Sequence, residues 1–382
     1  MRDRATRPLR VAMIGQKGYP PVHGGIEKHV AELAARLPGL GVEVDIYSRP
    51  HYSDAQGPAD LSGVRVLRLP SLATKHLDAI SHTVVCTLDA LGRRPDVVHY
   101  HALGPGLLSG LPRVLAGLPT VVTVHGLDWQ RDKWGRFARW VLRGGESACV
   151  SLPSRTIVVS EALREHFLTV HGKGTDYIPN GIAEAVLRRR LLVDERGIPG
   201  RFLLFVGRLV PEKGCHLLIE AWNRLDPSLR RDRELVIAGD AGFTPGYVGE
   251  LRAAAGPGVR FLGYIHGRLL EELYSHAEML VLPSTLEGLS ITLLEGMSYG
   301  RCCLVSDIPP NLEAAGECAE TFRSGDVADL ASRLAAALGD EARRKDLGTR
   351  ARERVAARYS WDRVAVATAA LYRECAVNRD RR

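Results

Sequence analysis

Short apolar runs alternate with helix-length segments along almost the whole chain of 382 residues. Several runs, such as VVTV and TIVV, are apolar on both faces, as strands of a parallel sheet covered by helices should be. The rhythm therefore predicts an α/β protein with parallel sheets. The expected strands are Val11–Gly15, Val42–Ser48, Val64–Leu69, Asp96–His101, Thr120–His125, Thr156–Ser160, Asp176–Pro179, Phe202–Val206, Leu235–Ala238, Val259–Leu262, Met279–Leu282 and Cys303–Ser306.

The rhythm lapses once, between Asn180 and Gly200, where a charge cluster is followed by the turn-rich sequence Gly-Ile-Pro-Gly. We therefore predict two tandem Rossmann-like, doubly wound domains with ligands bound at the carboxyl ends of their strands, in an interdomain cleft. The predicted domains are 1–185 and 186–360, followed by a last helical segment, 361–382. Helices with clear limits are expected at Ile26–Leu37, Lys75–Leu91, Trp134–Cys149, Glu161–Val170, 327–338, 341–358 and 361–378.

The net charge of +7 raises the question of a polyanionic partner. Residues 341–382 carry 12 Lys and Arg against 6 Asp and Glu, and residues 1–10 carry 4 Arg against 1 Asp, so the rest of the chain is close to neutral. Nucleic-acid binding needs a basic stripe with interleaved aromatic residues. A chain whose basic residues lie in excess only at its two ends does not show such a stripe, so no nucleic-acid partner is predicted.

No apolar run approaches the roughly 20 residues of a membrane span, and the apolar stretch Val11–Ile14 is too short for a signal peptide. A cytoplasmic location is expected, with the inner face of the membrane as an alternative. The seven cysteines form no C-x-x-C pair, which argues against a zinc site or a disulfide framework.

The first strand-to-helix loop, Gly15–Gly25, ends in Gly24 and Gly25 just before a helix. Backbone amides at a helix N-terminus attract anions, and glycine leaves room for them to approach. A simple turn with a helix cap is the alternative. The loop is not G-x-G-x-x-G, so no dinucleotide fingerprint is present.

A second loop follows the strand Phe202–Val206 and contains Arg208 and Lys213. A planar guanidinium and a movable ammonium group suit the oxygens of a diphosphate. The alternative is a solvated loop with incidental charges.

The most specific pattern places Glu287 and Glu295 on either side of a predicted helix N-terminus. Free amides there favour an anion, whereas the two carboxylates favour hydroxyl groups beside it. A ligand with hydroxyls on both sides of a phosphate is a sugar–diphosphate–nucleoside. The alternative is that a Glu near the helix N-terminus only stabilises the helix dipole. That would explain one of the two glutamates but not the whole loop.

The other histidines suggest no metal site. His99 and His101 alternate on a strand end and point to one face, and no carboxylate or Cys stands at ligand spacing, so we expect loop or cleft residues. His29, His166 and His171 are expected on helix surfaces.

The segment Trp129–Arg143 is both aromatic and basic. Trp134, Phe137 and Val141 would share one helix face, which favours core packing. Contact of the basic remainder with a membrane surface or an acceptor stays open as the alternative.

At this point the sequence resembles a known family. The run EGLSITLLEGMSYG is similar to the E-x7-E signature of family 4 retaining glycosyltransferases, which have the GT-B fold. Four further segments, in the right order, resemble motifs of that family. They are HGGIEKHV, VTVHG ending at His125 and Gly126, IPNG ending at Asn180 and Gly181, and GRLVPEKG.

The resemblance implies a role for each domain and residue. Domain 1–185 would bind the acceptor, domain 186–360 the nucleotide sugar, and helix 361–382 would cross back to the N-terminal domain. Glu287 would bind donor-sugar hydroxyls, Glu295 the ribose, and His125 the donor sugar near the reacting carbon. The diphosphate contacts would come from Gly24, Gly25, Arg208 and Lys213. The contacts to the sugar and phosphate would come from amides of Leu289, Ser290, Ile291 and Thr292. The base contacts would come from Tyr264 and Ile265.

The predicted function is transfer of a sugar from a UDP-, GDP- or dTDP-sugar to a hydroxyl of a sugar, a lipid-linked or a small-molecule acceptor, in polysaccharide, glycolipid or natural-product glycoside synthesis. Retention of configuration is implied by the resemblance alone. Because no D-x-D motif occurs, no metal or other cofactor is expected. The alternatives are a phosphorylase or epimerase of the same fold, a nucleic-acid binder and a non-catalytic relative.

Overall fold

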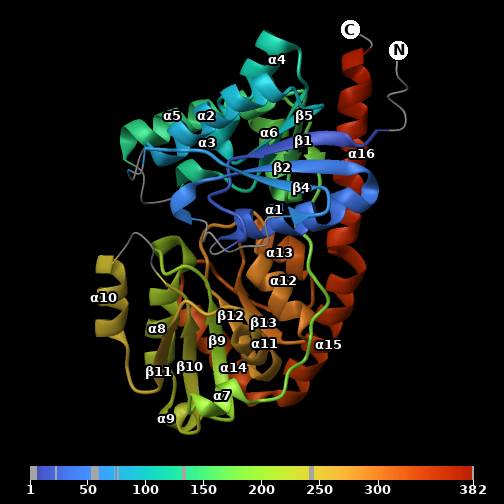
Figure 1. Cartoon of the computed structure of the whole chain (residues 1–382). Helices are drawn as coiled ribbons and strands as arrows, with labels where there is room; N and C mark the ends of the chain where they lie inside the picture. Colours follow the sequence, from blue (N-terminus) through green and yellow to red (C-terminus); the bar gives the residue numbers. More distant parts are fainter. Residues whose placement is uncertain are drawn as a thin grey trace. The chain divides into compact units, whose positions relative to one another are not determined.

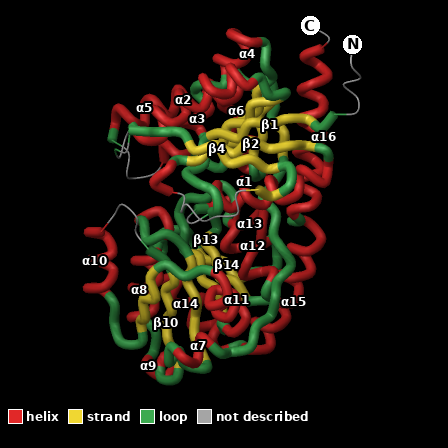
Figure 2. The backbone as a smooth tube through the Cα atoms, in the orientation of Figure 1, coloured by secondary structure: helices red, strands yellow, loops and turns green. Residues whose placement is uncertain are grey.

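The computed structural model describes residues 7–21, 24–52, 60–72, 74, 77–130, 135–240 and 245–380. The chain divides into two compact units, unit 1 (Met1–Gly181 with Trp361–Arg382) and unit 2 (Ile182–Ser360). Each unit contains one sheet flanked by helices, as Figures 1 and 2 show. The division falls within the predicted linker. Lys75, Trp134 and the residues before Arg7 lie outside the described residues.

Unit 1 contains an eight-stranded sheet with the order β3-β4-β2-β1-β5-β6-β7-β8, parallel throughout except for the β3–β4 pair. Its strands are β1 (Leu9–Ile14), β2 (Val42–Ser48), β3 (Asp60–Leu61), β4 (Val64–Arg68), β5 (Val97–His101), β6 (Thr120–Val124), β7 (Arg155–Val158) and β8 (Asp176–Tyr177). Its helices are α1 (Gly25–Arg36), α2 (Asp78–Arg93), α3 (Leu103–Gly106), α4 (Gly110–Ala116), α5 (Arg136–Ser151), α6 (Glu161–His171) and α16 (Trp361–Asp380). All residues of β5 and β6 are buried. In β6 this agrees with the prediction from its run VVTV, which is apolar on both faces.

Helix α16 packs within unit 1 although it follows unit 2 in the sequence. It contacts α1 and β5. Trp361 is buried at its start, and the Tyr372 hydroxyl lies 2.6 Å from Nδ1 of His99 on β5. The last helix therefore completes the core of the first unit.

Unit 2 contains a six-stranded, fully parallel sheet with the order β11-β10-β9-β12-β13-β14. Its strands are β9 (Arg201–Val206), β10 (Arg233–Ala238), β11 (Val259–Gly263), β12 (Met279–Leu282), β13 (Cys302–Ser306) and β14 (Glu320–Phe322). Its helices are α7 (Leu192–Glu195), α8 (Cys215–Arg224), α9 (Pro227–Arg230), α10 (Pro245–Ala254), α11 (Gly267–His276), α12 (Ile291–Ser298), α13 (Pro309–Ala315), α14 (Val327–Gly339) and α15 (Glu341–Arg358). The core of this unit packs around Trp222, Phe205 and Phe322.

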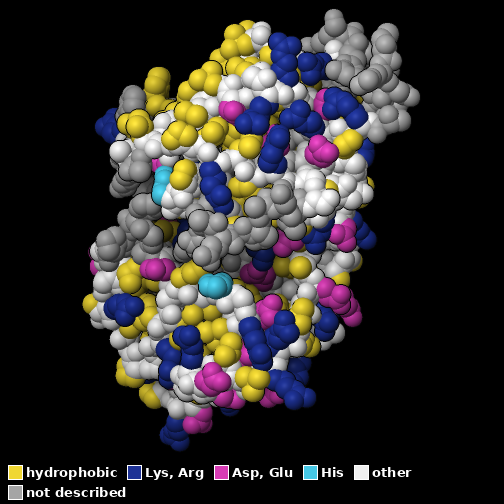
Figure 3. Space-filling view, viewed as in Figure 1, with side chains coloured by type: hydrophobic (Ala, Val, Ile, Leu, Met, Phe, Trp, Pro, Cys, Tyr) yellow, Lys and Arg dark blue, Asp and Glu magenta, His cyan; other side chains and the backbone are white. Residues whose placement is uncertain are grey.

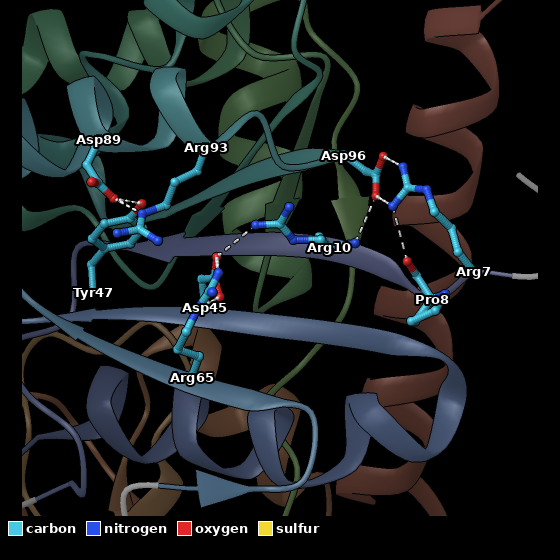
Figure 4. A network of polar contacts seen from close by, with 9 residues as sticks. All are labelled: Arg7, Pro8, Arg10, Asp45, Tyr47, Arg65, Asp89, Arg93 and Asp96. Carbon is cyan, nitrogen blue, oxygen red and sulfur yellow. Dashed lines mark hydrogen bonds and ion pairs between the residues drawn. The ribbon is translucent and has the colours of Figure 1, made fainter.

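The described arginines of the basic N-terminal segment are neutralised inside unit 1 (Figure 4). Arg7 forms an ion pair of 2.5 Å with Asp96, and the backbone amide of Arg10 donates to the same carboxylate at 2.9 Å. The Arg10 guanidinium also lies 3.6 Å from Asp45, which pairs with Arg65 as well. These arginines are thus paired with carboxylates in β2 and just before β5, although their side chains stay partly exposed.

Candidate functional site

The sheet of unit 2 has its topological switch point at β9, which lies between β10 and β12. Loops that leave neighbouring strands in opposite directions at such a point open a crevice at the carboxyl edge of the sheet. The loop after β9 carries Arg208 and Lys213, and the loop after β12 carries Glu287. The topology thus brings together two motifs that are far apart in the sequence.

The two loops are joined directly. Lys213 Nζ lies 2.5 Å from Glu287 Oε1, with side chains that are 20% and 9% exposed. The amide of Thr285 also donates to the carbonyl of Glu212 at 3.0 Å. Sequence reasoning assigned Lys213 and Glu287 to different parts of a ligand and did not foresee that they pair. Arg208 is exposed on the same loop.

Gly214 is required by the close approach of these loops. Its φ of +68° lies in the left-handed region, and a Cβ there would stand 2.0 Å from the carbonyl oxygen of Pro283. No larger residue fits without moving the β12 loop. The glycine that ends the GRLVPEKG motif therefore sets the spacing between the cation and the carboxylate.

Helix α12 begins directly after the Glu287 loop. The side chain of Ser290 caps it by accepting a hydrogen bond from the amide of Leu293 at 3.3 Å. The residues assigned to the phosphate side surround this start: Leu289 and Ser290 are buried, and Ile291 and Thr292 are half-buried. Free amides at the first turn make this helix end attractive to an anion.

Glu295 lies further along α12, where its carboxylate accepts a hydrogen bond of 2.7 Å from the hydroxyl of Tyr274 on α11. Burial raises the pKa of Tyr274 well above its usual value, and the neighbouring Glu295 carboxylate adds to that effect. Tyr274 thus stays a hydrogen-bond donor and orients the acid. No motif in the sequence pointed to Tyr274.

Tyr264 and Ile265 follow β11, which is an edge strand of the sheet and is separated from β9 by β10. Tyr264 is 40% exposed, and its ring centroid lies 5.6 Å from that of His266. An exposed aromatic ring at a strand end offers a face for stacking.

In unit 1, Gly24 caps α1 with a φ of +106°. The Glu27 side chain lies beside the N-terminus of this helix. The Glu27 carboxylate fills the space beside Gly24, where a Cβ would stand 2.2 Å from Glu27 Oε2, and Glu27 also accepts a hydrogen bond of 3.1 Å from the amide of Lys17. A side chain in the first turn of α1 thus already supplies a negative charge next to Gly24 and Gly25.

His125 follows β6 and belongs to a cluster of imidazoles. Its Nε2 lies 3.2 Å from Nδ1 of His101, and its ring centroid lies 4.8 Å from that of His29. The ligand-type atoms of His29, His101 and His125 all lie within 4.8 Å of one another. His29 is held in place because its Nδ1 lies 2.9 Å from Oδ1 of Asn180, in the IPNG motif.

Three expectations about histidines were wrong. His29 is only 2% exposed and is not a helix-surface residue, because α1 packs this side against the sheet end and Trp361. His99 and His101 do share one face, with ring centroids 4.1 Å apart, but both are fully buried in β5 and are not loop or cleft residues. Tertiary packing of α1 and α16 over the strand end covers all three rings.

Burial keeps these imidazoles neutral. It lowers the pKa of His29 to about 4, against the opposing effect of the hydrogen bond to Oδ1 of Asn180, and it lowers the pKa of His99 to about 3 together with the nearby His29. The pKa of His101 is held well below its usual value by burial and by the neighbouring histidines. Among the described residues, Nε2 of His101 is a buried polar atom with no hydrogen-bond partner.

The segment that follows His125 in unit 1 is held by the carboxylate of Glu146. Trp129 donates its indole N–H to Oε2 of Glu146 at 2.5 Å, and Arg143 lies 4.5 Å over the Trp129 ring. His166 and His171 both bond to Oε1 of Glu146, at 2.7 and 2.8 Å. These histidines are partly buried on α6, so the prediction that they lie on its surface was also wrong.

Comparisons with known proteins agree with this architecture. Residues 23–185 match the family model described as Glycosyltransferase Family 4, and residues 194–354 match the model described as Glycosyl transferases group 1. Alpha-maltose-1-phosphate synthase of Mycobacterium tuberculosis is 30% identical over 400 residues, covering 96% of this chain and 99% of that protein. D-inositol 3-phosphate glycosyltransferase of Geodermatophilus obscurus is 28% identical, covering 97% and 90%.

Solved structures share the fold. Sucrose-phosphate synthase from Thermosynechococcus elongatus matches with a TM-score of 0.81 and 22% identity, covering 96% of this chain and 98% of that one. Anabaena HepE in complex with UDP and glucose matches with a TM-score of 0.77 and 17% identity, covering 96% and 100%.

Two Rossmann-like units and these relatives define the chain as a glycosyltransferase of the GT-B fold that uses a nucleotide sugar. The chain belongs to glycosyltransferase family 4. The resemblance to this family and the prediction of a transferase enzyme are thereby confirmed.

Proposed function

We propose that unit 2 binds the diphosphate and sugar of the donor at the loops after β9 and β12. The observation that carries this proposal is the contact of 2.5 Å between Lys213 and Glu287 beside the N-terminus of α12. It supports a site where a cation and a helix end face the departing diphosphate while a carboxylate faces sugar hydroxyls.

In this proposal the leaving group is stabilised by electrostatics. Breaking a glycosyl–phosphate bond develops negative charge on the diphosphate and positive charge on the sugar ring. Arg208, Lys213 and the amides of Leu289, Ser290, Ile291 and Thr292 lower the cost of the negative charge. Glu287 binds donor-sugar hydroxyls.

Glu295 binds the ribose hydroxyls, and its hydrogen bond from Tyr274 supports this assignment because it fixes the carboxylate before the ligand arrives. Tyr264 and Ile265 contact the base. These assignments leave the base itself open among UDP, GDP and dTDP.

For unit 1 we propose that His125 contacts the donor sugar near the reacting carbon and that Gly24 and Gly25 contact the diphosphate through their amides. The Glu27 carboxylate has to turn away from Gly24 for that second contact. We therefore expect Glu27→Gln to tighten diphosphate binding if Gly24 and Gly25 take part.

The transfer goes to a hydroxyl acceptor with retention of configuration, as in family 4 generally, within polysaccharide, glycolipid or natural-product glycoside synthesis. We propose that it needs no metal ion, on the absence of a D-x-D motif. Full activity after EDTA treatment would support this, and activity restored only by a divalent ion would overturn it.

The first test is a thermal-shift series on the full chain with UDP, GDP, dTDP and ADP, followed by their sugars. One nucleotide should raise the melting temperature, because a ligand that binds only the folded state stabilises it. Lys213→Ala should lose the shift, whereas Lys345→Ala, which removes a lysine that is 77% exposed, should keep it. Binding of none of the four nucleotides would contradict the proposal.

A further inference from the structure

Helix α2 of unit 1 has an inverted distribution of side chains. Its buried residues include His82, Thr83 and Thr87, whereas Ile80, Val84 and Leu88 are 36%, 41% and 60% exposed. The exposed set recurs every four residues and therefore forms one stripe along the helix. A helix that served only as cover for the sheet would bury this stripe.

The two threonines of the buried polar face of α2 are hydrogen-bonded within the helix, whereas Nδ1 of His82 is buried without a hydrogen-bond partner among the residues that the structure describes. The hydroxyl of Thr83 donates to the carbonyl of Ala79 at 2.7 Å, and that of Thr87 donates to the carbonyl of Thr83 at 2.7 Å. The inversion leaves an aliphatic stripe that nothing in the described part of unit 1 covers.

Helix α4 continues this apolar surface. It contacts α2, and its residues Leu111, Val114 and Leu115 are 43%, 83% and 65% exposed at helical spacing. At its start a Cβ on Gly110 would stand 3.4 Å from Cβ of Leu152, which is 38% exposed at the end of α5. Figure 3 shows hydrophobic side chains gathered over α4 and beside it, with Lys and Arg side chains next to them.

The exposed charged residues in the segment that contains these helices are basic. Within the described parts of 77–152, each exposed charged residue is an arginine, while each acidic residue is buried or half-buried. One of these arginines, Arg93, is only 36% exposed and forms an ion pair with Asp89. The exposed arginines are Arg93, Arg94, Arg136 and Arg143. Helix α5 also exposes 71% of Trp140 between Arg136 and Arg143.

Aliphatic stripes with an arginine rim and an exposed Trp match the chemistry of an anionic lipid surface. Aliphatic side chains enter the acyl boundary, arginines meet the lipid phosphates and indole rings lie at the headgroup level. Among the described residues every helix is too short or too polar to span a bilayer, so the contact would be with one face of it.

We propose that the α2–α4 surface, defined by Ile80, Val84, Leu88, Leu111, Val114 and Leu115, docks unit 1 on an anionic membrane. This goes beyond the proposed chemistry and does not depend on it. The surface lies apart in sequence from the residues assigned to the donor, so the two proposals can fail separately.

Flotation of the full chain with vesicles tests the proposal. Binding is expected to phosphatidylcholine vesicles that contain phosphatidylglycerol, with little binding to phosphatidylcholine alone and a decrease as salt is raised. Val114→Glu with Leu115→Glu should lower the floated fraction at least about fivefold, because two carboxylates replace aliphatic contacts at an anionic surface.

The matched control is Val366→Glu with Val377→Glu. Those valines are 55% and 51% exposed on α16, which contacts α1 and β5 and lies on different elements from the α2–α4 surface. The control should float like the parent protein. Arg94→Asn with Arg136→Gln should weaken binding to the anionic vesicles and leave binding to phosphatidylcholine vesicles unchanged. Asparagine is chosen at position 94 because Arg94 has a φ of 48°, in the left-handed region that asparagine tolerates.

Equal flotation of the parent and the Val114/Leu115 variant would overturn the proposal. The proposal would also be overturned if the parent protein does not bind vesicles but forms a concentration-dependent dimer that the Val114/Leu115 variant abolishes. A second copy of the chain would then cover the surface. Nucleotide thermal shifts in every variant report separately on the fold and on the donor site.

Discussion

The two sheets of this enzyme place polar residues at the carboxyl ends of their strands in opposite electrostatic states. In unit 1, His29, His99 and His101 are buried as neutral imidazoles. In unit 2, Lys213 and Glu287 form an ion pair of 2.5 Å, and Lys213 is partly exposed.

The difference follows from what covers each strand end. In unit 1, α1 and α16 cover the ends of β5 and β6, and desolvation then favours the neutral form of each ring. In unit 2, the loops after β9 and β12 meet at the switch point, and Lys213 of one loop pairs with Glu287 of the other. A related architecture thus yields a packed neutral cluster in one unit and a charged crevice edge in the other.

The largest effect is expected in the charged unit. Lys213→Ala should lower turnover at least about tenfold, a loss on the order of 2–4 kcal/mol of transition-state stabilisation, because the leaving diphosphate loses a cation. Turnover with a saturating nucleotide sugar measures it, with Lys345→Ala as the control.

Removal of Lys213 also leaves Glu287 without that partner, and a second variant separates the causes. If Lys213→Ala with Glu287→Gln recovers the parent turnover, the loss came from the unpaired carboxylate, and Lys213 has no role at the diphosphate.

The neutral unit should be sensitive to acid. The folded-state pKa values of His29 and His99, about 4 and about 3, lie below the unfolded value, so the unfolded chain binds protons first as the pH falls. The stability contribution is complete above about pH 6.5 and is lost towards pH 4, on the order of 2 kcal/mol per imidazole at pH 5.

Hydrogen–deuterium exchange locates this loss. Amides of β5 and β6 should lose protection between pH 7 and pH 5 by more than those of β9 and β12, after correction for the intrinsic exchange rate. His29→Gln should reduce the difference between the units, and the exposed His266→Gln should leave it unchanged. Equal losses in both sheets would show that the cluster does not set acid sensitivity.

Glu146→Gln tests a carboxylate of unit 1 whose pKa is shifted in favour of the charged form, whereas the pKa values of the histidine cluster are shifted in favour of the neutral form. Burial alone would raise its pKa, but hydrogen bonds from His171, His166 and Trp129 hold the pKa below its usual value. The charge therefore stabilises the fold above about pH 4, and that contribution is lost as the pH falls through the folded-state pKa.

We expect the Glu146 variant to be less stable by about 1.5 kcal/mol at pH 7, the scale of a hydrogen bond to a charged group, and the gap to narrow in acid. Chemical unfolding monitored by tryptophan fluorescence measures it, and the exposed Glu165→Gln is the control. A gap independent of pH would assign the loss to packing.

The smallest effect is expected at Tyr274→Phe. Loss of the hydroxyl frees Glu295 to move, which should weaken nucleotide binding by about 1 kcal/mol, or about fivefold, with little change in kcat. Calorimetric titration with the nucleotide measures it. Tyr299→Phe, whose ring stacks on Tyr274 at 5.3 Å between centroids, is the control, and a similar loss there would point to packing.

The sequence alone determined the fold class and the family. Short doubly apolar runs such as Val121–Val124, alternating with helix-length segments, favour strands covered on both faces. The spacing of Glu287 and Glu295 around a helix start can also be recognised without coordinates. Local patterns carry this information because periodicity, capping and glycine turns are properties of neighbouring residues.

Only the tertiary structure decided which side chains meet and which charges survive. Lys213 and Glu287 pair through strand order, Tyr274 reaches Glu295 from another helix, and His29 and His101 are buried by elements far away in the sequence. Charge state depends on desolvation and on partners in space, and neither can be read from the spacing of residues along the chain.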